Sequence, residues 1–322
     1  MNKMQELQLK EQLTILKQMV NDMELPYLRV SLTDTCNARC AFCHNEGQEK
    51  TADSSEKIEE LGNDEHSFIA DFFKANFSRV VFTGGEPLRS TFIYDAVKIY
   101  KSFGYNIGLT TNGILLDENT QKKLASAGLD TVNISINSLE KKQYEAFYGV
   151  DKLDSVLENM ESLPKYISPK NLKLNFVVTK LTDFNSDVER FSLLSKRKGF
   201  IVSVLFDIKE TDTTCLTKKL KEKLFQLYGH PKEETFNKDK RIKHLFVYKN
   251  DALWEFDDYR TYENQFSLKN NSVCRECVLK DDCQEGAYAL RLYSDGTFRL
   301  CLGRKDNALN IICKKHKGDG KL

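Results

Sequence analysis

The segment YLRVSLTDTCNARCAFC, residues 27–43, joins a short apolar run to three cysteines in the spacing C-x3-C-x2-C. The run is rich in branched and aromatic residues, which is typical of a buried strand. Cys36, Cys40 and Cys43 follow it directly. Soft thiolate ligands favour zinc, copper(I) or iron–sulfur centres. Three thiolates leave one metal position open, which suits an iron–sulfur cluster that binds a further molecule. A zinc knuckle and free thiols are alternative interpretations, and the adjacent His44 could supply a fourth ligand.

Five more apolar runs follow, separated by longer amphipathic segments. The runs are 79–83, 106–110, 131–136, 172–178 and 200–206, and the helix-like segments are 66–77, 89–103, 117–127, 152–162 and 185–198. Apolar runs that alternate with helices indicate parallel strands in βα units. We therefore predict an α/β fold, a partial (β/α)6 barrel with its helices outside.

The flanking regions have a different texture. Residues 1–24 have helical periodicity and are expected to form a helix on the body, before a barrel at 25–210. The Lys- and Glu-rich segment 211–250 is interpreted as a linking helix and loop. Residues 251–322 are expected to form a small C-terminal α+β auxiliary domain, with two strands in 289–302 joined by a turn.

Polar motifs stand at the ends of consecutive predicted strands. TGGEP occupies 83–87, TTNG occupies 110–113, and Asn133 and Ser135 lie in the fourth strand. Two glycines allow close approach of a ligand to the backbone, and Glu86 can accept a hydrogen bond from an amino group. Because parallel barrels bind ligands at the carboxyl ends of their strands, these motifs and the cysteines are expected to share one site.

Composition excludes several classes of protein. Lys and Arg number 48 against 47 Asp and Glu, for a net charge of +1, so a dedicated nucleic-acid-binding function is not expected. No apolar run reaches about 18 residues, so no membrane span is expected. The N-terminal segment lacks an apolar signal core, which favours a cytoplasmic protein whose nine cysteines are ligands or free thiols.

The motifs together resemble those of the radical S-adenosylmethionine (SAM) superfamily. The resemblance implies that Cys36, Cys40 and Cys43 hold a 4Fe–4S cluster whose open iron binds SAM, and that SAM cleavage yields a 5′-deoxyadenosyl radical for hydrogen abstraction. It also implies that Gly84, Gly85 and Glu86 hold the methionine amino group. The full set of implied SAM-contacting positions is Phe42, Gly84, Gly85, Glu86, Pro87, Thr111, Asn112 and Ser135.

A second cysteine group lies near the C-terminus. Cys274, Cys277 and Cys283 are spaced C-x2-C-x5-C, and Cys301 follows the predicted hairpin. Four thiolates suit a closed site, either zinc or a fully ligated 4Fe–4S cluster, and the first group favours the cluster. Cys215 and Cys313 are expected to be ordinary thiols.

A closer resemblance, to the GTP 3′,8-cyclase family of molybdenum cofactor biosynthesis, extends over most of the chain. Positions that match its nucleotide-contacting residues are retained at Arg29, Thr110, Lys180 and Arg291. Two arginines of that family are replaced by Val81 and Ala289, and its thioether position appears as Asp207. Cys283 would fill the iron position that the family leaves open for guanine.

These differences favour a radical SAM enzyme that is a paralog of the cyclase and acts on a peptide or a nucleotide-like molecule. A true GTP 3′,8-cyclase and a non-enzymatic metal-binding regulator are the alternatives. The expected cofactors are two 4Fe–4S clusters and SAM, with flavodoxin or ferredoxin as electron donor. No catalytic acid or base is assignable beyond the cluster.

Overall fold

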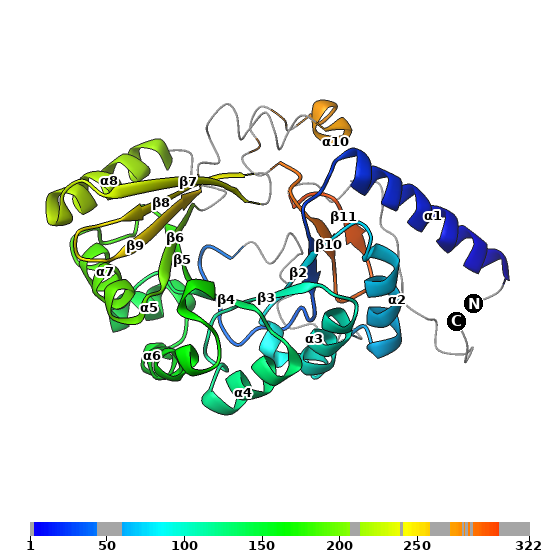
Figure 1. Cartoon of the computed structure of the whole chain (residues 1–322), viewed down its shortest axis with the longest axis horizontal. Helices are drawn as coiled ribbons and strands as arrows, with labels where there is room; N and C mark the ends of the chain where they lie inside the picture. The colour runs from blue at the N-terminus through cyan, green and yellow to red at the C-terminus, as the bar shows by residue number, and fades with distance from the viewer. Residues whose placement is uncertain are drawn as a thin grey trace.

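A computed structural model describes residues 3–43, 60–206, 213–238, 241–257, 271–278, 280, 283 and 286–302. His44, Asp207 and Cys313 lie outside these residues. In the described part, one curved sheet has its major helices on the convex side (Figure 1).

Six parallel strands form the middle of the sheet in chain order, as predicted. They are β1 (Leu28–Ser31), β2 (Arg79–Thr83), β3 (Asn106–Thr111), β4 (Thr131–Ser135), β5 (Leu172–Val178) and β6 (Ile201–Phe206). Each strand pairs in parallel with the next, so all six carboxyl ends lie along one edge. The predicted α/β partial barrel is confirmed.

Helices connect these strands and cover the outer face of the sheet (Figure 1). They are α2 (Asn63–Phe73), α3 (Ile93–Ser102), α4 (Glu118–Ala127), α5 (Lys141–Tyr148), α6 (Leu153–Ser162) and α7 (Asp187–Lys198), with the N-terminal α1 (Lys3–Asp22) packed beside them. Short 3-10 turns lie at Pro87–Arg89 (η2), Leu163–Lys165 (η3) and Pro169–Asn171 (η4). The core lies between helices and sheet, with fully buried residues such as Phe82, Leu109 and Phe176. Helix α5 has no counterpart among the helices predicted from the sequence.

Strands from the C-terminal third extend both edges of the same sheet. β9 (Leu253–Asp257) pairs in parallel with β6, and β8 (Arg241–Val247) and β7 (Lys232–Lys238) follow in antiparallel order. At the other edge, β10 (Leu290–Leu292) pairs in parallel with β1 and carries β11 (Phe298–Arg299). The hairpin predicted in 289–302 is therefore present, but it joins the barrel sheet and does not form a sheet of its own.

The segment predicted as a linking helix and loop contains α8 (Thr213–Tyr228) followed by the β7–β8 hairpin. The helix prediction is confirmed, whereas the two strands were missed. Residues 232–236 of β7 are all exposed, and this strand ends the sheet. An edge strand without a buried face has no alternating apolar pattern, so the sequence carried no strand signal there.

Alternate residues of the parallel strands face the concave side of the sheet, away from the helices. Several of them are polar, including Arg29, Thr110, Asn133, Lys173 and Ser203. The concave face and the carboxyl-end edge therefore form the region for chemistry. Among the described helices, none combines the length and apolarity needed to cross a bilayer.

Candidate functional site

The three cysteines of the first group lie on a loop that begins where β1 ends. Cys36 is exposed, and Cys40 and Cys43 are half-buried. The end of α5 holds this loop: the backbone N–H of Arg39 donates to the Tyr148 carbonyl at 2.8 Å, and that of Ala41 donates to the Phe147 carbonyl at 2.9 Å. The cysteine loop is thus supported by backbone bonds, independently of any bound group.

Phe42, the aromatic residue before the last cysteine, packs on the same helix. Its ring meets the rings of Phe147 and Tyr148 edge-on, with centroids 6.1 and 5.8 Å apart. In the structure this side chain therefore anchors the cysteine loop to α5 through an aromatic contact.

Gly84 and Gly85 lie directly against the chain that leads into the cysteine loop. The N–H groups of Gly85 and Glu86 donate to the carbonyls of Thr33 and Thr35, both at 2.8 Å. A Cβ on Gly84 would lie 2.4 Å from the Thr33 oxygen, and one on Gly85 would lie 2.3 Å from the Thr35 oxygen. Gly84 also has φ 141°, a conformation that favours glycine. The two glycines are required because two backbones meet here.

The Glu86 carboxylate is buried at the centre of the site, with 1% of the residue exposed. Its Oε1 accepts from the Thr111 hydroxyl at 2.7 Å and from the Leu88 N–H at 3.1 Å, and its Oε2 accepts from the Asn112 N–H at 2.8 Å. Burial raises the pKa of Glu86, and these three hydrogen bonds oppose that effect. The groups that hold the carboxylate are all neutral, so a cationic ammonium group is a matching ligand.

Asn112 connects Glu86 to the cysteine loop. Besides its backbone contact with Glu86, its side-chain Nδ2 donates to Asn37 Oδ1 at 2.7 Å and lies 3.9 Å from Cys36 Sγ. Its Oδ1 accepts from the Ile114 N–H at 3.0 Å. The predicted convergence of the cysteines, GGEP and TTNG is thus present in the geometry.

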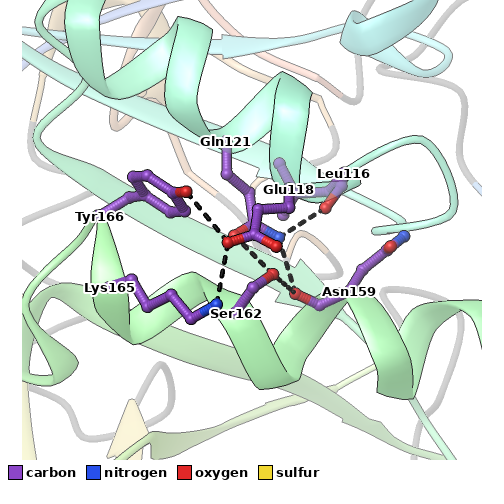
Figure 2. A network of polar contacts seen from close by, with 7 residues as sticks. All are labelled: Leu116, Glu118, Gln121, Asn159, Ser162, Lys165 and Tyr166. Atoms are coloured by element: carbon purple, nitrogen blue, oxygen red, sulfur yellow. Dashed lines mark hydrogen bonds and ion pairs between the residues drawn. The ribbon is translucent and has the colours of Figure 1, made fainter.

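A polar network holds the loop after β3 from behind (Figure 2). Gln121 Nε2 donates to the Leu116 and Asn159 carbonyls, both at 2.7 Å, and Ser162 Oγ donates to Gln121 Oε1 at 2.9 Å. Asn159 Nδ2 also donates to the Gly113 carbonyl at 2.9 Å. Because α4 and α6 supply these groups, the loop that carries Thr111 and Asn112 is tied to the helical layer.

The same network includes an exposed ion pair. Lys165 and the Tyr166 hydroxyl contact Glu118 Oε1 at 2.9 and 3.0 Å (Figure 2). The Lys165 hydrogen bond, followed by that of Tyr166, lowers the pKa of Glu118. Exposed pairs of this kind add little free energy, so the buried amide contacts carry the support.

The residues present fit the two cofactors that the motifs imply. Three thiols supply soft ligands for iron, and the negative charges of Glu86 and Cys43 act on the Cys36 thiol. Burial, followed by those charges, raises the pKa of Cys36 although the residue keeps an exposed surface. In the described part of the chain, no three His, Cys, Asp or Glu side chains are placed to bind a single metal ion.

In the second cysteine group, Cys283 and Cys301 lie close enough to Cys274 to affect its pKa. Cys274 is the third residue of the short α10 (Ser272–Arg275), and its N–H donates to the side chain of the N-cap residue Asn271 at 2.8 Å. Burial raises the pKa of Cys274, and the neighbouring Cys301 and Cys283 raise it further. The Gly286 N–H donates to Cys283 Sγ at 3.4 Å. Cys274 and Cys301 are buried, whereas Cys277 and Cys283 are half-buried.

Three of the four predicted substrate residues face the concave side of the sheet. Arg291 pairs with Arg29 across β10 and β1, and Arg29 pairs with Val81 across β1 and β2. Arg29 Nη2 donates to Thr83 Oγ1 at 3.3 Å. Thr110 lies on β3 two residues after Gly108, the partner of Val81, and pairs with Asn133 of β4. Lys180 is exposed and follows the end of β5.

A small apolar cluster adjoins the two arginines. Val81 and Ala289 are buried with Tyr27, and Tyr288 packs against them. The rings of Tyr27 and Tyr288 lie 6.2 Å apart. Arg291 donates to the Tyr288 hydroxyl at 2.7 Å and lies over its ring. Val81 and Ala289 are thus buried among aromatic rings, and the Arg79 guanidinium lies over the Tyr27 ring at 5.3 Å from its centroid.

A buried charge cluster on the concave face is not predicted from the sequence. Glu255 of β9, 1% exposed, contacts the Nζ atoms of Lys173 and Lys243 and lies 3.3 Å from Ser203 Oγ. Burial alone would raise the pKa of Glu255, but the two lysines lower it to about 2. The only signal was a glutamate inside the apolar run LWEF at 253–256.

Ser135 lies at the carboxyl end of β4, opposite Asn175 of β5. Pro87 is buried and begins the 3-10 turn that Glu86 caps. The support of the site by α5, which carries Tyr144 and Tyr148, is likewise not predicted from the sequence. Their spacing of four residues on one helix face was the available signal.

Comparison with known proteins agrees with this geometry. Residues 30–191 match the family model described as the radical SAM superfamily. A protein of Thermococcus kodakarensis named "Probable GTP 3',8-cyclase" is 31% identical over 299 residues, covering 90% of this chain and 89% of that protein. A protein of the same name from Sulfurisphaera tokodaii is 31% identical, with coverages of 88% and 83%.

Solved structures show the same fold. Streptococcus suis SuiB bound to the precursor peptide SuiA has a TM-score of 0.63 at 18% identity, covering 90% of this chain. The match spans 64% of the SuiB chain. The structure of anSMEcpe with bound AdoMet has a TM-score of 0.59 at 16% identity, covering 89% of this chain and 77% of that chain.

Proposed function

This chain belongs to the radical SAM superfamily, and we propose that its 4Fe–4S cluster is held by Cys36, Cys40 and Cys43 with SAM bound beside Glu86. The family implies an enzyme that uses such a cluster and SAM. When bound, these groups supply a 5′-deoxyadenosyl radical that abstracts hydrogen from the substrate. The observation that carries the site assignment is the convergence on Glu86, which links GGEP, TTNG and the cysteine loop.

The protein's own residues bind and position the cofactor. Glu86 offers a carboxylate held by three neutral donors, which suits the methionine ammonium group. Phe42 and the α5 carbonyls hold the cysteine loop in place. Ser135, at the carboxyl end of β4, is the proposed contact for the carboxylate or ribose of SAM.

We assign the substrate to the concave face beside Arg29 and Arg291. Arginine pairs well with carboxylate or phosphate, so the substrate carries at least one such anion. Val81 and Ala289 supply no further cation beside these arginines, and they are buried against Tyr27 and Tyr288, whose rings stack with Arg79 and Arg291. This chemistry favours a peptide or nucleotide-like molecule with less charge than a nucleoside triphosphate, and Thr110 and Lys180 remain candidate contacts.

GTP 3′,8-cyclase activity is the second candidate. The relatives with that name favour it, since they match about nine tenths of this chain. The retained Arg29 and Arg291 are consistent with a nucleotide. Cyclase activity requires that GTP, with its triphosphate, binds beside Val81, whereas the first proposal requires a less charged substrate there.

Reconstituted protein incubated with SAM, reductant and GTP distinguishes these candidates. Formation of the cyclic 3′,8-product identifies the cyclase and refutes the proposal of a different substrate. Release of 5′-deoxyadenosine without that product supports the proposal. A V81R/A289R variant supplies a matched comparison: tighter GTP binding than wild type is expected if the lack of positive charge at these two positions weakens GTP binding.

Cys274, Cys277, Cys283 and Cys301 are the proposed ligands of a second 4Fe–4S cluster. Full ligation would make it an electron relay or a structural centre. Iron analysis tests this, with about eight irons per chain expected from two four-iron clusters. A flavodoxin or ferredoxin is the proposed electron donor. Zinc in place of iron, with no SAM cleavage, would instead support a metal-binding regulator.

A further inference from the structure

Two tyrosine hydroxyls are buried beside the cysteine loop. Tyr144 and Tyr148 lie four residues apart on α5, and their stacked rings have centroids 4.5 Å apart. Both side chains are at most 1% exposed. Neither hydroxyl has an acceptor for its proton among the described residues. The Asn137 backbone N–H approaches the Tyr148 oxygen as a donor, which leaves the Tyr148 proton without an acceptor.

A buried hydroxyl without an acceptor is costly, and native proteins rarely keep one without a reason. Replacement by phenylalanine would fill almost the same space, so packing alone does not require the oxygens. Two such groups on one helix face indicate that an acceptor belongs next to them.

The position of α5 shows where that acceptor lies. Its last turn bonds to Arg39 and Ala41 on either side of Cys40, and the Tyr148 ring meets Phe42 at 5.8 Å. Burial raises the pKa of both tyrosines, and the next largest cause in each is the negative charge of Cys40. The end of α5 thus packs on the segment around Cys40, and Cys40 is the charged group with the largest effect on both hydroxyls.

We propose that Tyr144 and Tyr148 donate hydrogen bonds to sulfur at the Cys40 corner of the 4Fe–4S cluster and raise its reduction potential. The inference rests on the proposed role of Cys40 as a cluster ligand. Hydrogen bonds to the sulfurs stabilise the more negative, reduced cluster, so they shift the potential upward. These are positioning residues: they act through the ligand and touch no substrate.

Redox titration of the reconstituted cluster, without substrate, tests the proposal. Tyr144→Phe and Tyr148→Phe are each expected to shift the midpoint potential downward. A tenfold loss in the one-electron equilibrium constant corresponds to about 59 mV. The double variant should shift further than either single variant. Unchanged potentials in both variants, at full iron content, would overturn the proposal.

Tyr105→Phe is the matched control, because Tyr105 is buried near the amino end of β3 and donates to the Ala70 carbonyl at 2.8 Å. It should destabilise the apoprotein and leave the potential unchanged. Tyr144→Phe should leave apoprotein stability equal or higher, since its hydroxyl has no partner there. A clear loss of apoprotein stability in Tyr144→Phe would show a structural role and contradict the inference. Wild-type protein that takes up no iron would instead refute the cluster assignment itself.

Discussion

Replacing Gly85 with alanine tests whether the close backbone contact supports the cysteine loop. The new Cβ would lie 2.3 Å from the Thr35 oxygen, 2.6 Å from its carbonyl carbon and 2.7 Å from the Asp34 oxygen. These are backbone atoms that cannot turn aside, so the two segments must separate. Separation weakens the two hydrogen bonds that Gly85 and Glu86 donate to residues 33 and 35.

The expected cost follows from these contacts. Overpacking costs about 1–3 kcal/mol, and each lost backbone hydrogen bond adds about 1 kcal/mol. We therefore expect Gly85→Ala to lower the free energy of unfolding by about 3 kcal/mol. It should also reduce iron incorporation, because the displaced chain leads directly to Cys36.

Urea unfolding of the apoprotein and iron content after reconstitution measure the two effects. Gly104→Ala is the control, since Gly104 has φ 87° but no atom within 4 Å of the added Cβ. That variant should lose about 1–2 kcal/mol from backbone strain and retain full iron. A Gly85→Ala protein with wild-type stability and iron content would refute the reasoning.

Three further perturbations give distinct outcomes. Thr111→Val removes a 2.7 Å donor to buried Glu86 and should weaken SAM binding about tenfold by calorimetry, at about 1.4 kcal/mol; an unchanged affinity would contradict the role of Glu86. His66 is buried with its pKa lowered to about 4, so the unfolded chain takes up the proton first. The contribution of His66 to the free energy of unfolding should therefore fall by about 3 kcal/mol as the pH drops from about 6.5 to 4. Urea unfolding at several pH values measures this dependence, which should be absent in His66→Gln. Glu255→Gln leaves Lys173 and Lys243 without their shared carboxylate and should cost about 3 kcal/mol in thermal or urea unfolding, whereas a neutral effect would show that the charge cluster is dispensable.

Much of the fold could be predicted because its strands are buried on the helix-facing side. Val80, Phe82, Ile107 and Leu109 alternate with residues that are small or only moderately polar, which left short, clear apolar runs. Helix α5 is short and its signal is weak, since its buried residues are Tyr144, Phe147 and Tyr148 among charged neighbours. It was missed for that reason.

Most residues of the candidate site could also be predicted from the sequence, but their contacts could not. Cys36, Glu86 and Asn112 were identified because their motifs follow strands whose carboxyl ends must meet at one edge of a parallel sheet. The partners of Glu86 could not be predicted, because Thr111 and Asn112 reach it across 25 and 26 residues of chain. Glu255 was missed because its lysine partners come from two distant strands.

The amino-acid sequence by itself determined the order of the six parallel strands, the ligand chemistry of the cysteines and the motifs that gather around them. These are local properties: each depends on the residue types within one strand and the loop that follows it. Only the tertiary structure decided that Gly85 meets the backbone at Thr35, that Val81 and Ala289 join Tyr27 and Tyr288, and that the end of α5, with two buried tyrosines, packs on the segment around Cys40. Each of these contacts joins segments distant in the chain, and the curvature and register of one continuous sheet bring them together.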